Sequence, residues 1–167
     1  MINTKNIIIG SLFAAIAALF QLIPVFFSEV LVFLTIFSAV PIYIVSRINP
    51  KTGILSYLVA SIIVMILSVH EGLFFLCTNG IVGISLGICS YYIRKESAIW
   101  ILSSIALTIT LSIMNYGIGI PVFGMKIPGG IIIQILILFL VSVTYNIFYY
   151  YFLNFIYRYL KKNLRSI

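Results

Sequence analysis

Three amide side chains stand out in a chain that is otherwise almost entirely apolar. Asn79, Asn115 and Gln134 each fall inside a long apolar run, about 5 to 10 Å below the same predicted membrane surface at 1.5 Å of rise per residue. An amide both donates and accepts hydrogen bonds, and polar groups at membrane depth usually face a bundle interior or a cavity. Their common level predicts an outward-opening pocket for a small ligand. For each residue alone, a hydrogen bond between neighbouring helices is the alternative.

Further polar side chains fall near the same predicted surface. Tyr116 adjoins Asn115, and the loops on that side contribute two acids, the only histidine and one lysine. The lysine belongs to an irregular segment, IPVFGMKIPGG (120–130), whose prolines and glycines oppose regular helix, so this segment is either a lid or a plain connector. The predicted substrate-binding residues are Glu29, His70, Glu71, Asn79, Asn115, Tyr116, Lys126 and Gln134.

Several kinds of catalytic site are missing from the sequence. His70 has no second histidine four positions on, so it makes no zinc-protease motif, and no histidine lies within a predicted span for a Ser-His-Asp triad. No GxxxxGK[ST] loop occurs, which excludes ATP hydrolysis by that route. No acid falls inside a predicted span, so a carboxylate proton relay has no obvious carrier. We expect no catalytic residue, no metal ligand and no cofactor, and hence no enzyme.

The amino-acid composition indicates the environment, water or lipid, of the segments that carry these residues. Of 167 residues, 63% are hydrophobic and only 8% are charged, with a mean hydropathy of +1.25. Such a chain belongs in lipid. A helix needs about 20 apolar residues to cross a bilayer, so six crossings would use nearly the whole chain. The sequence therefore predicts an all-α, polytopic membrane protein, a compact bundle of six transmembrane helices that forms a single domain over residues 1–167.

Clusters of charged residues mark the ends of these helices, because a charge at the bilayer centre costs about 2.5 to 3.5 kcal/mol on insertion scales. Glu29, His70 and Glu71 are accordingly assigned to loops. The predicted spans are 7–27, 30–46, 53–69, 72–93, 98–120 and 131–157.

The distribution of cations predicts the orientation. If the spans alternate in direction, nine of the ten Lys and Arg residues fall on one side and only Lys126 on the other. By the positive-inside rule both termini lie in the cytoplasm, and the protein lies in a bacterial cytoplasmic membrane. The net charge of +7 is then mainly a topology signal, and the basic C-terminal tail is suited to anionic lipid headgroups. Nothing in the pattern indicates nucleic acid.

Two stripes of small residues and one group of tyrosines remain. Ser11, Ala14 and Ala18 recur at helical spacing on the first span, as do glycines and a serine on the fourth. Such stripes allow close helix approach in lipid, either within the bundle or against a partner subunit. The tyrosines of the last span predict an anchor at the cytoplasmic interface. The second stripe is Gly80, Gly83, Gly87 and Ser90, and the tyrosines are Tyr145, Tyr149, Tyr150, Tyr151, Tyr157 and Tyr159.

Several of these features occur together in one known family. They are six helices with cytoplasmic ends, an alanine-rich first helix (SLFAAIAALF), a second helix containing Ala39-Val40-Pro41-Ile42 and a fourth reading TNGIVGISLG. In this pattern the chain resembles the substrate-binding S components of energy-coupling factor (ECF) transporters, especially their YybS-like relatives. The resemblance covers most of the chain and is clearest over residues 10–92.

The resemblance implies a function and partners. It places a vitamin or similar small molecule between the outer loops and the outer halves of helices four to six, where Asn79, Asn115, Lys126 and Gln134 lie. It also implies that Ala14 and Ala18 contact a membrane coupling subunit driven by ATPases on other chains, so that ATP hydrolysis topples the bundle and delivers the ligand inward. No motif for a particular vitamin is present. The alternative is a non-transporting envelope scaffold or membrane partner protein, similar to the MreD type or to the YybS-like relatives, which would bind proteins and no small ligand.

Overall fold

The computed structural model describes residues 4–122 and 130–164, with side chains as far as residue 162. All regular elements in these ranges are helical, which confirms the predicted all-α class, and six stretches are long and apolar enough to cross a membrane, as many as the predicted spans. The elements are α1 (Thr4–Phe26), η1 (Glu29–Ser38), α2 (Ala39–Ile48), α3 (Pro50–Leu67), α4 (Val69–Cys77), α5 (Asn79–Tyr92), α6 (Glu96–Ser112), η2 (Ile113–Ile118) and α7 (Ile131–Leu164).

The second span changes its winding part-way along. It begins as the 3-10 helix η1 and continues as the α-helix α2. Pro41 has no N–H to bond the carbonyl four residues earlier, which weakens regular α-helix at this junction. Hydroxyls support the 3-10 winding from within, since Thr35 Oγ1 donates to the Val32 carbonyl at 2.7 Å and Ser38 Oγ to the Thr35 carbonyl at 2.6 Å. The 3-10 winding therefore sets the direction of the η1 carbonyls, which lie near the polar residues of the candidate site described below.

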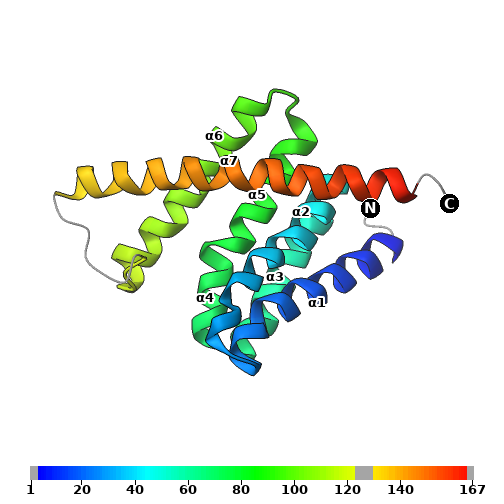
Figure 1. The fold of residues 1–167 in the computed structure, drawn as a ribbon, viewed down its shortest axis with the longest axis horizontal. Coiled ribbons are helices and arrows are strands. Elements are labelled where there is room, and N and C mark those ends of the chain that lie inside the picture. Colours follow the sequence, from blue (N-terminus) through cyan, green and yellow to red (C-terminus); the bar gives the residue numbers. More distant parts are fainter. Residues whose placement is uncertain (1–3, 123–129, 165–167) are drawn as a thin grey trace.

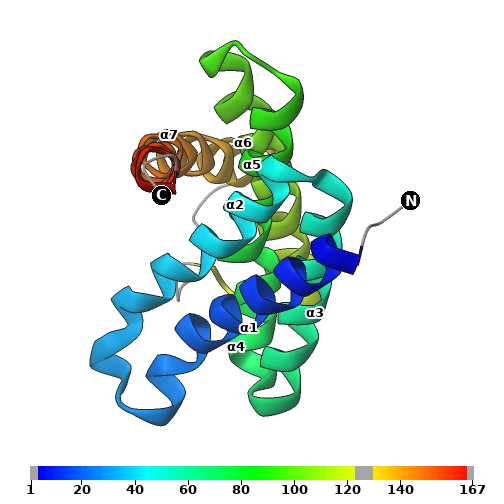
Figure 2. The ribbon, with the colours of Figure 1, turned by 90° about the vertical axis from the view of Figure 1, so that its right-hand side faces the viewer.

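Close packing of α5 against α2 forms the centre of the fold (Figure 2). A Cβ at Gly83 would lie 2.7 Å from the Ala39 carbonyl oxygen, and one at Gly87 would lie 2.5 Å from Ser46 Cβ. Only glycine permits this approach. The stripe predicted on the fourth span therefore packs against a helix of the same chain.

The last helix does not run alongside the others. Figures 1 and 2 show α7 crossing α2 and α5, whereas α3 runs alongside the span that α4 and α5 form end to end. At 1.5 Å per residue, its 34 residues span about 51 Å, and little of its apolar length is buried. The prediction of a compact bundle therefore describes the first five spans better than the sixth, because α7 packs mainly on α6.

One of two hydrogen-bonded attachments of α7 to the centre of the fold lies at Arg47 on α2. Its guanidinium donates to Asn154 Oδ1 at 2.8 Å and to the Tyr43 hydroxyl, and it lies 4.2 Å from the centroid of the Tyr157 ring. Hydrogen bonds and a cation–π contact thus hold the guanidinium between the two helices. The second attachment, at Tyr145 and Tyr149, belongs to the candidate site.

Candidate functional site

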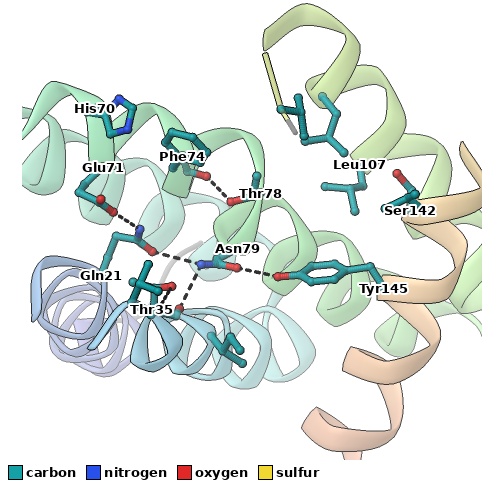
Figure 3. A pocket seen from close by; sticks show the side chains of 15 residues that line it. Gln21, Thr35, His70, Glu71, Phe74, Thr78, Asn79, Leu107, Ser142 and Tyr145 are labelled. Atoms are coloured by element: carbon teal, nitrogen blue, oxygen red, sulfur yellow. Dashed lines mark hydrogen bonds between the residues drawn. The ribbon is translucent and has the colours of Figure 1, made fainter. Parts of the chain in front are cut away.

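A cavity of about 410 Å³ lies where the fourth span is interrupted. Side chains from α1, η1, α4, α5, α6 and α7 converge on it (Figure 3). Its walls are largely apolar, with polar groups concentrated on one side. The described residues that line it are Gln21, Val32, Thr35, Ile36, His70, Glu71, Phe74, Thr78, Asn79, Leu107, Leu111, Val122, Val141, Ser142 and Tyr145.

The interruption occurs at Thr78, whose backbone leaves helical geometry between α4 and α5 (φ −123°, ψ −95°). A break at membrane depth frees carbonyls that must find other donors. Here the Tyr57 hydroxyl donates to the Leu76 carbonyl at 2.7 Å, and Thr110 Oγ1 donates to the Cys77 carbonyl at 2.9 Å. Side chains from α3 and α6 therefore stabilise the break, which places Asn79 at the start of α5 beside the cavity.

Asn79 joins four elements through its side-chain amide. Nδ2 donates to Gln21 Oε1 on α1 at 3.3 Å and to the Thr35 carbonyl on η1 at 3.1 Å. Oδ1 accepts from the hydroxyls of Tyr145 and Tyr149 on α7 at 3.0 and 3.2 Å. An amide has two N–H donors and two acceptor positions, and all four are used here. The structure thus confirms that Asn79 faces inward and makes it the centre of a network.

Gln21 extends this network to an acid. It is 2% exposed, its Nε2 donates to Glu71 Oε2 at 2.7 Å, and its Oε1 also accepts from Ser38 Oγ at 3.0 Å. In Figure 3 the hydrogen bonds run from Glu71 through Gln21 and Asn79 to Tyr145. The sequence prediction omitted Gln21, although an amide in the middle of the apolar first span was a signal of the same kind as Asn79.

His70 and Glu71 are not loop residues, as the sequence analysis had assigned them. Both lie in the first turn of α4, which begins at Val69 and is capped by Ser68 Oγ accepting the Glu71 N–H at 3.4 Å. The span therefore starts three residues earlier than predicted, and an acid does lie inside it. Glu71 faces the cavity, while the exposed His70 stands at the rim with its ring 4.7 Å from that of Phe74.

The other predicted binding residues are not brought to this cavity. The Tyr116 hydroxyl donates to Gln134 Oε1 at 2.5 Å, which links η2 to the start of α7, and Asn115 also lies on η2. Glu29 lines a separate hollow of about 320 Å³, which Glu71 also borders. Lys126 lies outside the described residues.

Two groups from the sequence analysis have different surroundings from those expected. Tyr145 and Tyr149 were predicted to anchor the helix at the membrane interface, but they face the network, and Tyr149 is fully buried. Ala14 and Ala18 are 0% and 2% exposed, packed inside the bundle. Their contact with a coupling subunit remains a prediction that would require this surface to open. Whether these tyrosines and alanines face the interior or the lipid depends on the rotation of each helix about its axis, which sequence spacing alone does not fix.

Ser142 adds an unused polar group to the cavity wall. It is fully buried, and its hydroxyl oxygen has no hydrogen-bond partner within the part of the chain that the structure describes. Burying a hydroxyl without a partner costs free energy, about 1 to 3 kcal/mol from mutational data. The sequence analysis did not select Ser142, because a serine in an apolar helix commonly bonds its own backbone.

The described residues of the site do not form a metal centre, and the comparisons with known proteins identify no relative of the chain. Among residues 4–122 and 130–164, no three His, Cys, Asp or Glu side chains are grouped to hold a metal ion. No protein-family model, curated protein or solved structure matches the chain. The function has to be inferred from the cavity and its groups.

Proposed function

We propose that this protein captures a small molecule in the cavity at the break of the fourth span, as the substrate-binding subunit of a membrane importer. The observation that carries the proposal is a cavity of about 410 Å³ with a continuous polar network on one side and the unpartnered Ser142 hydroxyl in its wall. This volume is typical of ligand sites, roughly 300 to 1,000 Å³. Interrupted helices at membrane depth are also a recurring way to build such sites in transporters.

The membrane setting gives the direction of capture. If the cation-rich ends are cytoplasmic, the His70 rim of the cavity faces outward, and the ligand enters from outside. The chain has no ATP-binding loop of the GxxxxGK[ST] type, so energy for import would come from other chains. This arrangement is that of an ECF S component taking up a vitamin or related micronutrient with a coupling subunit and ATPases, in a bacterial cytoplasmic membrane.

The envelope scaffold has less support. Its proposed partner surfaces were the small-residue stripes, and Ala14, Ala18 and Gly83 pack against other helices of this chain. A scaffold also gives no reason for a cavity with an unpartnered hydroxyl. It remains the outcome expected if no small molecule binds.

Ligand binding can be tested with a variant that fills the cavity. Val141 lines the cavity and is 39% exposed, so Val141→Trp should occupy the space, while Leu140→Trp, at a neighbouring position 57% exposed and outside the lining, is the matched control. Purified protein in lipid nanodiscs would be screened by thermal shift against vitamins and their precursors. A ligand at 100 times its Kd should stabilise the wild type and Leu140→Trp by about 2.7 kcal/mol, but not Val141→Trp.

Two results would contradict the proposal. One is that no compound stabilises the wild type and no coupling subunit or ATPase co-purifies with it. The other is that a ligand stabilises Val141→Trp as much as Leu140→Trp, which would place binding outside this cavity.

A further inference from the structure

The free hydrogen-bonding capacity of the cavity is unevenly distributed. Asn79 has none left, because both its N–H groups and both acceptor positions are used within the protein. Gln21 accepts two hydrogen bonds at Oε1 and donates one from Nε2. The groups that remain for a ligand are therefore mainly at the two ends of the cavity, Glu71 and Ser142.

Glu71 holds most of the unused acceptor capacity. A carboxylate can accept about four hydrogen bonds, and among the described residues Glu71 receives one side-chain bond, from Gln21. The described lining contains no Lys or Arg to neutralise it. It lies in the first turn of α4, where negative charge interacts favourably with the positive end of the helix dipole. Within its described lining, the cavity thus contains a carboxylate without a cation.

The opposite end of the cavity is neutral. Figure 3 shows Ser142 across the cavity from Glu71, with Leu107 on the same side. The Ser142 hydroxyl can donate and accept, while Phe74, Leu107 and Leu111 supply apolar surface between the two ends. A ligand complementary to these groups has one charged end, one polar neutral end and an apolar body.

We propose that the ligand is a small organic cation, such as a protonated amine on an aromatic or aliphatic body, whose positive group pairs with Glu71 and whose far end bonds Ser142. This inference rests on the proposed function, since it names the ligand class of the same cavity. An ionisable side chain at membrane depth usually has a functional partner, and here the ligand supplies it. An anionic ligand would meet an uncompensated carboxylate.

Matched probes separate charge from shape. Tryptamine and tyramine are cations at neutral pH, tryptophol and tyrosol are the corresponding neutral alcohols, and indole-3-acetate and 4-hydroxyphenylacetate are anions with the same rings. Affinities would be measured by isothermal titration calorimetry on the full chain in nanodiscs, for wild type, Glu71→Gln and Glu29→Gln. Glu71→Gln retains an oxygen that accepts from Gln21. Glu29→Gln removes the same charge outside the cavity.

The wild type should bind each amine at least about tenfold more tightly than its alcohol and should not bind the acids. Glu71→Gln should abolish the preference, and Glu29→Gln should keep it. Alcohols or acids that bind as tightly as amines would overturn the cation inference and leave the proposed function standing. Any ligand from the vitamin screen is measured on the same three proteins, and a neutral or anionic ligand unaffected by Glu71→Gln would overturn the inference equally. If nothing binds in either experiment, both fail.

Discussion

At the level of single residues, the side chain of Asn79 has the hydrogen-bond donors and acceptors that its position requires. It stands at a helix break in an apolar bundle, where an unsatisfied polar group costs about 1 to 3 kcal/mol, and it satisfies groups on α1, η1 and α7 at once. No other side chain of similar size offers two donors and two acceptors in one plane apart from glutamine. Its role is therefore to organise the cavity, and under the proposed function direct ligand contact falls to Glu71 and Ser142.

Asn79→Ala should destabilise the protein substantially, because it removes the hydrogen bonds of the Asn79 amide to Gln21, to the Thr35 carbonyl and to the two tyrosine hydroxyls from the centre of the network. We expect a loss of roughly 2 to 4 kcal/mol in the free energy of unfolding, measured by titration with SDS in mixed micelles. The control is Asn115→Ala, which removes an amide from η2 outside the network and should cost less than about 0.5 kcal/mol. Equal losses for the two variants would show that the network contributes little to stability.

At the level of elements, α5 packs closely against α2 because the glycines of α5 at this contact carry no side chain. The added Cβ at Gly83 would contact a backbone oxygen, which cannot rotate away, so the two helices would have to separate. Because lipid provides no hydrophobic drive for helix association, such van der Waals contact is a main source of stability. The cavity depends on it indirectly, since α2 continues η1 and α5 begins at Asn79.

Gly83→Ala is therefore expected to lower stability by about 1 to 3 kcal/mol, as overpacking usually does. Gly117 on η2 is the matched control, since its added Cβ would meet only Ile113 Cγ2, at an ordinary 3.6 Å. Gly117→Ala should leave the unfolding midpoint unchanged or raise it slightly, because alanine favours helix over glycine. Thermal unfolding in detergent compares the two. A tolerated Gly83→Ala would mean that α2 and α5 can move apart without cost.

At the level of the whole molecule, the crossing of α7 is the feature that most affects how the protein sits in a membrane. Its hydrogen-bonded attachments at Asn79 and at Arg47 lie from the middle of the helix onward, and most of its other contacts are with α6. A helix of about 51 Å can span the bilayer only if it is strongly tilted or protrudes from it. The proposed orientation, with both termini in the cytoplasm, requires that it does span.

Cysteine labelling in intact cells tests this orientation. In a background with Cys77 and Cys89 replaced, Glu29→Cys and Ile131→Cys should react with a membrane-impermeant maleimide from outside. Lys95→Cys and Lys162→Cys should react only after the membrane is permeabilised. If positions 131 and 162 label from the same side, α7 does not cross the membrane and the chain has five spans.

The sequence by itself determined the number and approximate limits of the long apolar helices, because a bilayer demands long apolar runs and places charges at their ends. It also determined that Asn79 faces inward, since an amide in lipid has to find partners. Only the tertiary structure decided that Gln21, Glu71 and Tyr145 join it while Asn115 and Gln134 do not. In lipid both the buried and the exposed faces of a helix are apolar, so the sequence carries little record of rotation or tilt. Those were set by the glycine contacts of α5, the break at Thr78 and the crossing of α7.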